Sequence, residues 1–443
     1  MGALFGTDGV RGLANRDVTA ELALDLSVSA AHILSEVGQR RSAIVGRDPR
    51  ASGEFLQSAV AAGLASAGVD VWDVGVLPTP AVAYLTKTRS ADLGVMLSAS
   101  HNAMPDNGIK FFNAEGNKLA DEIEAQIEAR MGEEWQRPVG DAVGRISSDS
   151  EGADEYVAHL LTTVDSLSGL KVVVDGANGA ASQVAPLTYR EAGAEVIAIH
   201  CAPDGYNINR DCGSTHLGDL QKAVVEHGAD LGIGHDGDAD RCLAVDASGA
   251  LVDGDQLMAI IALAMRDAGR LAHDTVVATV MANLGFKQAM QRESISVVET
   301  AVGDRYVLEA MLASGYVLGG EQSGHVVMTE HATTGDGLLT ALQVMNRMVA
   351  TGASLAELAG VMRRLPQVLV NVSGVDKNAL ETCGAVSDAV SAAQEQLSDS
   401  GRVLLRKSGT EPLVRVMVEA QDEATATGVA QSLAQTVRDH LSL

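Results

Sequence analysis

The sequence predicts an α/β protein in which three homologous domains with mixed sheets and a smaller C-terminal α+β domain surround a central cleft. Two observations carry this prediction. A short apolar run that ends in a polar loop recurs along the chain, and each copy follows further β-rich runs separated by a helix-like stretch. Strands that alternate with helices are typical of βαβ units. The predicted domains are 1–150, 151–252, 253–365 and 366–443.

The clearest repeat joins Ala91–Gly94 with Ala229–Gly232, since both read Ala-Asp-Leu-Gly. Each copy opens an apolar run that ends in a loop rich in Ser, Gly or Asp, at 98–102 and at 236–241. A weaker third copy covers 315–325. Because ligands of open α/β sheets bind beyond the carboxyl ends of the strands, we expect the three loops to face one site.

The other strands of the first three domains are predicted from apolar runs with many β-branched residues. These runs are 43–48, 69–76, 172–177, 195–200, 276–280 and 295–300. Gly140–Gly152, rich in Gly, Ser and Asp, is predicted to be the first linker. The run Leu257–Met265 is too short to span a membrane, which takes about 20 residues, and is therefore predicted to be a buried helix.

After Pro366 the pattern changes to that of a small α+β domain. We expect strands at 368–372, 403–405 and 413–418 and helices at 380–397 and 424–441. A segment of this length lies within the usual range for a domain.

The 443 residues include 32 Lys and Arg against 58 Asp and Glu, a net charge of −26. This excess of acids argues against nucleic acid or an anionic membrane surface as a partner, because both need clustered cations. It still permits an anionic small molecule in a local basic pocket. The start of the chain has no apolar run, so we expect no signal peptide, and four scattered cysteines predict reduced thiols in the cytoplasm, without disulfides or a zinc site.

Asp236, Asp238 and Asp240 are the strongest chemical signal in the sequence. Carboxylates at alternate positions repel one another unless a cation lies between them, and a set of oxygen ligands suits Mg²⁺ or Ca²⁺. A polar turn is the alternative, because Asp-Gly clusters are common in turns. An EF-hand calcium loop is excluded, since Arg241 stands where that loop requires Gly.

Ser100 and His101 lie in the first repeated loop. A Ser beside a His can act as nucleophile and base, but the pair by itself is a weak signal, since a Ser-rich turn with a surface His would look the same. No Gly-x-Ser-x-Gly elbow surrounds Ser100, which argues against an α/β-hydrolase. If the fold brings Ser100 next to the Asp cluster, a hydroxyl beside a metal would indicate phosphoryl transfer.

Three further loops are rich in polar groups or glycine. Arg406–Glu411, followed by Arg415, has the cations, hydroxyls and glycine of a phosphate-binding loop, although a solvated basic turn is the alternative. It is not a Walker A motif. Glu321–His325 suits hydrogen bonds to sugar hydroxyls, or it is only a polar loop. Gly6–Gly12 lacks the preceding strand of a dinucleotide-binding fingerprint, so a tight turn and a ligand loop stay open.

These loops, in this order, resemble those of the α-D-phosphohexomutase superfamily over essentially the whole chain. The matching segments are Ser98–Asn102, Asp236–Arg241, Gly320–His325 and Arg406–Pro412. The opening Phe5–Gly12 and Gln322 are most similar to the branch that acts on glucosamine phosphates. Two positions differ from the superfamily pattern: Ala103 stands where Pro is usual, and Ala239 stands where Gly is common.

The resemblance implies an enzyme that interconverts glucosamine 6-phosphate and glucosamine 1-phosphate and feeds the synthesis of UDP-N-acetylglucosamine and cell-wall precursors. Ser100 would be a phosphoserine, with glucosamine 1,6-bisphosphate as intermediate and activator. One Mg²⁺ per subunit would bind Ser100, Asp236, Asp238 and Asp240. Implied substrate-binding residues are Arg241, Glu321, Ser323, Arg406, Ser408, Gly409, Thr410 and Arg415. Implied catalytic candidates, with roles not apportioned, are Arg11, His101, Lys110 and His325.

Other functions stay open at this point. The nearest is the same chemistry on mannose or glucose phosphates. A Mg²⁺-dependent sugar phosphatase, in which water attacks phospho-Ser100, is another. A sugar-phosphate sensor without turnover is a third, but the intact Ser100 and the three Asp residues argue against it, because a sensor has no need of a nucleophile. A sugar phosphate is thus the expected partner, and a homodimer is a further expectation.

Overall fold

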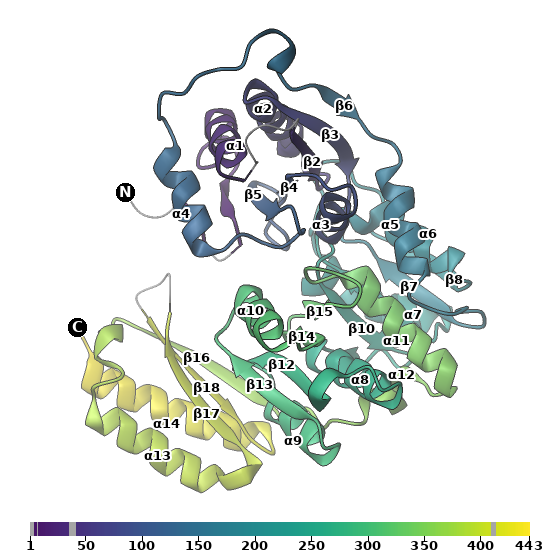
Figure 1. The fold of residues 1–443 in the computed structure, drawn as a ribbon. Helices are drawn as coiled ribbons and strands as arrows, with labels where there is room; N and C mark the ends of the chain where they lie inside the picture. Colours follow the sequence, from purple (N-terminus) through teal and green to yellow (C-terminus); the bar gives the residue numbers. More distant parts are fainter. Residues whose placement is uncertain (1–3, 7, 35–40, 409–412) are drawn as a thin grey trace. The chain divides into compact units, whose positions relative to one another are not determined.

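The computed structural model describes residues 4–6, 8–34, 41–408 and 413–443. The chain divides into two compact units, each assembled from two stretches of sequence (Figure 1). The first unit contains Met1–Met281 and Ser296–Val361, and the second contains Ala282–Ile295 and Met362–Leu443. Among the described residues, no helix combines the length and apolar character needed to cross a membrane.

The first unit begins with a sheet of six strands in the order β1-β5-β4-β2-β3-β6. Its strands are β1 (Val10–Leu13), β2 (Arg41–Arg47), β3 (Val69–Val76), β4 (Leu93–Leu97), β5 (Asp106–Asn113) and β6 (Ile146–Ser148). The four accompanying helices are α1 (Ala20–Leu34), α2 (Ala51–Ser66), α3 (Thr79–Thr88) and α4 (Asp121–Arg130). Strand β4 is buried along its whole length, as expected for a central strand whose sheet is covered on both faces.

The predicted linker at Gly140–Gly152 is partly wrong. Within it, β6 pairs in parallel with β3 and forms the edge of the first sheet. Helix α5 (Gly152–Leu161) then begins at the last residue of the segment and packs against α3. Strand β6 has three residues, and its Ser residues give no apolar run, so the hydrophobic pattern did not reveal it.

The second sheet of this unit has the order β11-β10-β9-β7-β8. Its strands are β7 (Lys171–Asp175), β8 (Glu195–Ile199), β9 (Leu231–His235), β10 (Cys242–Asp246) and β11 (Leu251–Val252). Helices α6 (Ala181–Glu191) and α7 (Gly218–His227) pack against its strands. The four cysteines are free thiols, as predicted.

The third sheet has the order β13-β12-β14-β15. Its strands are β12 (Thr275–Thr279), β13 (Ser296–Thr300), β14 (Leu318–Gly320) and β15 (Val326–Met328). The accompanying helices are α8 (Gly254–Asp267), α10 (Asp304–Ser314), α11 (Gly337–Thr351) and α12 (Leu355–Ala359). Helix α8 confirms the buried helix predicted at 257–265, and it starts with a capping box between Asp253 and Gln256.

The three sheets share one topology. In each, a first strand lies between two parallel neighbours, and a fourth strand returns antiparallel beside the third. The equivalent sets are β3-β2-β4-β5, β8-β7-β9-β10 and β13-β12-β14-β15. The repeated α/β architecture is therefore confirmed, and the loops after β4, β9 and β14 occupy equivalent positions. The domain boundaries read from the sequence, and a cleft shared with the C-terminal domain, stay predictions.

The second unit is built on an antiparallel sheet of three strands. Its elements are β16 (Gln367–Ser373), β17 (Arg402–Lys407), β18 (Leu413–Glu419), α9 (Leu284–Arg292), α13 (Gly384–Leu397) and α14 (Glu423–Leu441). Helices α13 and α14 lie side by side against the sheet (Figure 1). Buried Glu419 ties α9 to this sheet, because it accepts hydrogen bonds from Leu284 N at 2.9 Å and Arg402 Nε at 3.0 Å.

Candidate active site

Three loops of the first unit meet at one place. They follow β4, β9 and β14 and contain the segments 98–102, 236–241 and 321–325. Arg241 and His325 form an antiparallel backbone bridge between two of them. Gly237 packs so closely on the first loop that a Cβ there would lie 2.5 Å from Ser100 O, which explains why a residue without a side chain stands at this position. The three repeated loops thus form one site.

Ser100 is 1% exposed and lies between an acid and an imidazole. Its Oγ is 2.5 Å from Asp236 Oδ2 and 3.3 Å from His101 Nδ1. Burial, together with the charges of Arg241 and Arg11, lowers the pKa of His101 to about 4, so its imidazole is neutral at pH 7. The fold therefore places the Ser hydroxyl directly beside the Asp cluster, which is the arrangement that favours phosphoryl transfer over a Ser-rich turn.

Asp236, Asp238 and Asp240 are buried, and their carboxylate oxygens lie within 4.8 Å of one another. Among the described residues, Asp238 Oδ1 and Asp240 Oδ1 are buried without a hydrogen-bond partner. Unpartnered buried carboxylate oxygens are costly, and oxygen is the ligand that hard divalent cations prefer. Ala239 adopts a φ of 57° between them, so it keeps the left-handed turn for which Gly is common. These residues fit a divalent metal ion.

The charges around the three acids are uneven. Burial, followed by repulsion from Asp240 and Asp238, raises the pKa of Asp236 well above its usual range. Burial acts to raise the pKa of Asp238, but the charge of Lys110 and the hydrogen bonds from Lys110 and Thr79 together lower that pKa below its usual range. Lys110 Nζ lies 2.8 Å from Asp238 Oδ2, which also accepts a hydrogen bond from Thr79 Oγ1 at 2.6 Å. One acid is thus neutralised by a lysine, and the repulsion among the others is what a metal ion would relieve.

Lys110 belongs to a charge network that centres on Asp8. Lys110 Nζ lies 3.0 Å from Asp8 Oδ2, and Asp8 also pairs with Arg11 and, at 2.6 Å, with Lys118. Three cations on one carboxylate place Arg11 and Lys110 together at the edge of the Asp cluster. Sequence reasoning missed Asp8 and Lys118. Asp8 lies in the glycine-rich opening, which could have indicated it, but no motif surrounds Lys118.

The same network reaches His325. Lys118 pairs with Asp304, whose Oδ2 lies 3.4 Å from His325 Nε2. Asp240 Oδ2 is 3.9 Å from the same ring nitrogen. Among the described residues, neither ring nitrogen of buried His325 has a hydrogen-bond partner. Nε2 of this buried imidazole thus faces two acids, which makes His325 a candidate for the chemistry of the site.

The loop after β14 joins the site to its surroundings through two different side chains. Glu321 Oε1 accepts from Gly303 N at 3.3 Å, and Ser323 Oγ donates to the other carboxylate oxygen at 3.5 Å. Gln322 Nε2 instead donates to Asp253 Oδ2, at 3.3 Å, at the start of α8. Glu321 and Ser323 are therefore joined by a hydrogen bond to each other, whereas Gln322 anchors the loop to the start of α8.

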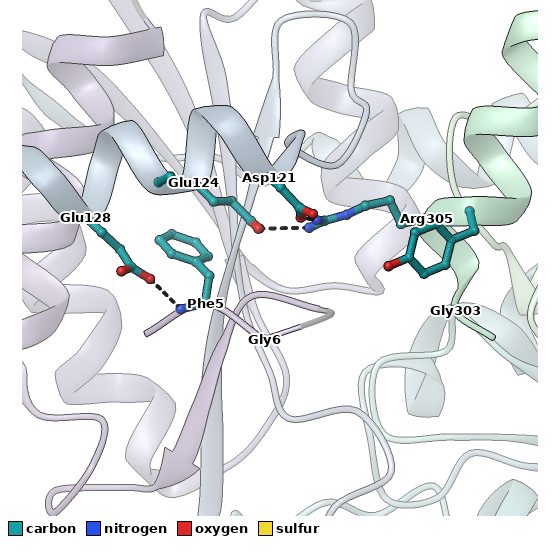
Figure 2. A pocket seen from close by; sticks show the side chains of 9 residues that line it. Phe5, Gly6, Asp121, Glu124, Glu128, Gly303 and Arg305 are labelled. Carbon is teal, nitrogen blue, oxygen red and sulfur yellow. Dashed lines mark hydrogen bonds and ion pairs between the residues drawn. The ribbon is translucent and has the colours of Figure 1, made fainter. Parts of the chain in front are cut away.

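A pocket of about 420 Å³ lies next to Gly303, between α4 and α10 (Figure 2). Its lining residues are Phe5, Gly6, Asp121, Glu124, Ala125, Glu128, Gly303, Arg305 and Tyr306. Arg305 extends toward the acids of α4, where its Nη2 lies 2.9 Å from Glu124 Oε2 and where it also pairs with Asp121 (Figure 2). Glu128 Oε1 accepts from Phe5 N at 2.8 Å. The two pairs of Arg305 therefore fasten α10 to α4.

Replacing Arg305 by Ala is expected to lower the free energy of unfolding by about 1–3 kcal/mol, because Glu124 loses a charged hydrogen-bond donor. Glu124 is 7% exposed, so water does not replace the donor well. Urea unfolding measures the change. Arg270→Ala is the matched control, since its pair with Glu330 spans 3.8 Å and is largely exposed. Equal losses in both variants would contradict this interpretation.

The second unit carries the basic loop predicted to bind phosphate. Arg406 on β17 and Arg415 on β18 are direct cross-strand partners. Burial and the neighbouring charge of Arg415 lower the pKa of Arg406. Lys377 Nζ donates to Ser408 O at 2.7 Å, so a third cation lies at this loop, and sequence reasoning did not include it. Like charges side by side favour an anion, as a phosphate would supply. The predicted residues Gly409 and Thr410 lie outside the described residues.

Comparison with known proteins identifies the family. Family models for phosphoglucomutase/phosphomannomutase alpha/beta/alpha domains I, II and III match residues 2–137, 154–249 and 253–365, and the C-terminal domain model matches 345–436. A curated phosphoglucosamine mutase from Streptomyces griseus subsp. griseus is 65% identical over 100% of both chains. This chain belongs to the phosphoglucosamine mutase family. Another member, from Acidothermus cellulolyticus, is also 65% identical, over 99% of this chain and 96% of its own.

Solved structures share the fold of this phosphoglucosamine mutase family member. A phosphoglucomutase/phosphomannomutase family protein from Burkholderia thailandensis has a TM-score of 0.82 at 23% identity, covering 99% of this chain and 97% of that one. Aspergillus fumigatus N-acetylphosphoglucosamine mutase, solved with GlcNAc-6P and magnesium, has a TM-score of 0.68 at 18% identity and covers 99% and 96%. The superfamily predicted from the four loops is confirmed. Membership implies a metal cofactor, which the buried Asp triad can hold.

Proposed function

We propose that this chain interconverts glucosamine 6-phosphate and glucosamine 1-phosphate in the cytoplasm, as a source of UDP-N-acetylglucosamine and of cell-wall precursors. One observation carries the proposal: the buried hydroxyl of Ser100 lies 2.5 Å from Asp236 Oδ2, and Asp236 belongs to a cluster of three buried acids. Full-length identity of 65% to curated phosphoglucosamine mutases supports the choice of sugar.

In the proposed reaction Ser100 carries a phosphoryl group. The Oγ–P bond breaks as O1 of glucosamine 6-phosphate forms the new bond to phosphorus, and the O1 proton passes to a base in the site. The product, glucosamine 1,6-bisphosphate, reorients. Its 6-phosphoryl group then returns to Ser100 Oγ, and O6 takes up a proton. Glucosamine 1-phosphate leaves, and the bisphosphate also serves as activator because it can phosphorylate a free Ser100.

Asp236, Asp238 and Asp240, together with an oxygen on phospho-Ser100, would hold one Mg²⁺ per subunit. When bound, Mg²⁺ offsets the negative charge of the transferring phosphoryl group. Lys110 balances Asp238, and Arg241, whose Nε lies 3.9 Å from Asp240 Oδ1, is placed to contact the phosphoryl oxygens. The chain thus supplies cations on both sides of the acids.

Four residues are our candidates for moving protons and stabilising charge. Arg11 and Lys110 are cationic side chains that Asp8 holds together. His101 is neutral and lies 3.3 Å from Ser100 Oγ, and His325 lies near two acids. His101 lies within hydrogen-bonding distance of Ser100 Oγ, and imidazole is the side chain that most often transfers protons in enzymes. We therefore assign the two histidines to proton transfer and the two cations to charge stabilisation.

The substrate would be held at its two ends by different loops. Glu321 and Ser323 supply hydrogen bonds to sugar hydroxyls. We assign the distal phosphate to Arg406, Ser408, Gly409, Thr410 and Arg415. A guanidinium donates parallel hydrogen bonds to phosphate oxygens, so one such loop can hold either the 1-phosphate or the 6-phosphate.

Competition among sugar phosphates tests this function. With glucosamine 6-phosphate, glucose 6-phosphate and mannose 6-phosphate present together, kcat/KM is expected to be at least about tenfold higher for the amino sugar. Equal or better use of glucose or mannose phosphate would instead assign the chain to the phosphomannomutase/phosphoglucomutase reaction. Inorganic phosphate as the main product would indicate a phosphatase.

A further inference from the structure

Ser100 holds a backbone conformation that residues with a Cβ rarely adopt. Its φ is 50°, in the left-handed region, and this costs energy unless surrounding contacts hold it. One contact comes from Ser98, whose Oγ accepts from Ser100 N at 2.9 Å. The same Oγ donates to Asp48 Oδ2 at 2.7 Å. The amide side of Ser100 is therefore fixed within its own loop and sheet.

The carbonyl side of Ser100 is held by two other side chains. Arg50, which is fully buried, donates through Nη2 to Ser100 O at 3.1 Å and to Asn102 O at 2.9 Å. Arg50 Nη1 also donates to Ala103 O at 2.6 Å, so hydrogen bonds constrain the position where Pro is usual. Asn209 Nδ2 donates to the carbonyls of Ser100 and Asn102 at 2.8 and 2.9 Å. The same two carbonyls thus receive donors from both sides.

Asn209 reaches Ser100 from a different sheet. It lies in the loop after β8, where its own φ is 56° and its N donates to Ala177 O at 2.9 Å. Gly237, between two acids of the triad, packs against the contact, since a Cβ there would be 3.0 Å from Asn209 Nδ2 and 2.5 Å from Ser100 O. The amide of Asn209, the Ser100 carbonyl and the loop of the acids therefore meet at one point.

We propose that Asn209 is a positioning residue for the Ser100 nucleophile. By donating to two carbonyls of the Ser100 loop, it fixes that loop against the loop of the acids and maintains the left-handed backbone at Ser100. The inference rests on the proposed function. Because the two bonds end on the backbone of the nucleophile loop, loss of Asn209 displaces Ser100 from the acids and leaves the groups assigned to the sugar and the distal phosphate in place.

The variant Asn209→Asp tests this role, since it keeps the size and the tolerance for positive φ but turns two donors into a carboxylate facing two carbonyls. We expect kcat to fall about 10- to 100-fold, the scale set by a displacement of about 1 Å, with KM for glucosamine 6-phosphate unchanged within about twofold. Asn207→Asp is the matched control. Asn207 lies in the same loop and donates instead to Ala202 O, and we expect wild-type kcat.

A single-turnover transfer from labelled phospho-Ser100 gives a second readout, and its rate is expected to fall by the same factor as kcat. Asn209→Ala, which removes the donors without adding charge, should show a smaller loss in kcat, again without a change in KM. Wild-type kcat in both variants, or a raised KM with unchanged kcat, would overturn the role.

Repeating the assays with glucose 6-phosphate as the acceptor distinguishes a failure of the Asn209 proposal from a failure of the proposed function. A wild-type enzyme that uses only glucose phosphate contradicts the function, while the mutant-to-wild-type ratio still tests Asn209.

Discussion

Ser100→Ala is expected to abolish turnover, with kcat for glucosamine 6-phosphate reduced at least about 10³-fold, as for the loss of an attacking nucleophile in other enzymes. The Ser100 hydroxyl lies 2.5 Å from Asp236 Oδ2, so its loss removes the oxygen that would carry the phosphoryl group. Ala keeps a Cβ, so the cost of the positive φ is the same in both proteins. The variant should therefore stay folded, which a thermal melt checks.

Ser58→Ala is the matched control for this substitution. Ser58 lies exposed on α2, and its Oγ donates only to Glu54 O in its own helix, so full activity is expected. Retention of more than about a tenth of wild-type kcat in a folded Ser100→Ala protein would rule out the phosphoserine mechanism.

Asp236→Asn is expected to remove metal binding and to lower kcat at least about 10²-fold, because one of three carboxylates no longer offsets a divalent charge. For the wild type, Mg²⁺ at 100 times its Kd should add about 2.7 kcal/mol to the free energy of unfolding, seen as a rise in Tm. The variant should lose that rise. Asp230→Asn, an exposed change just before β9, should keep it.

With Mg²⁺ bound, the wild type should be more stable than Asp236→Asn. Without metal, we expect the variant to be the more stable of the two. The pKa of Asp236 is raised in the folded protein by burial and by Asp240 and Asp238, so its contribution to stability is present at low pH and is lost as pH rises through the folded pKa. Asn cannot ionise and escapes this loss. Metal-free Asp236→Asn should therefore melt above metal-free wild type at pH 8, with a smaller difference at pH 5. A lower Tm for the variant at both pH values would contradict a triad held under charge repulsion.

Local sequence patterns were sufficient to predict the repeated α/β architecture. Strands such as β4 and β9 are buried at every residue and consist mainly of apolar residues and glycine, and polar loops with Ser or Asp residues follow them. Strand β6 was missed because it has three residues and partners only β3, so its formation depends on an edge supplied by another part of the chain. Tertiary pairing, rather than propensity, decides such a strand.

The residues of the site also divide into those that local motifs predict and those that depend on tertiary contacts. Ser100 and the three acids stand in dense motifs, so their chemistry could be predicted. Asn209 could not be found in this way, because its partners are far away in sequence and it stands in no motif. Asp8 lies in the glycine-rich opening, but two of its three cationic partners, Lys110 and Lys118, are more than 100 residues away. Gln322 stands at a position where the chain resembles the branch that acts on glucosamine phosphates, and its amide donates a hydrogen bond to Asp253 at the start of α8.

Transfer of a labelled phosphoryl group from Ser100 tests the central claim most directly. Protein labelled at Ser100 is mixed with one equivalent of glucosamine 6-phosphate and Mg²⁺, and the label is followed over a single turnover. We predict that it appears in glucosamine 1,6-bisphosphate and glucosamine 1-phosphate, with Ser100 still phosphorylated at the end. Label found only in inorganic phosphate, or label that stays on the protein while glucosamine 1-phosphate forms, would contradict the account.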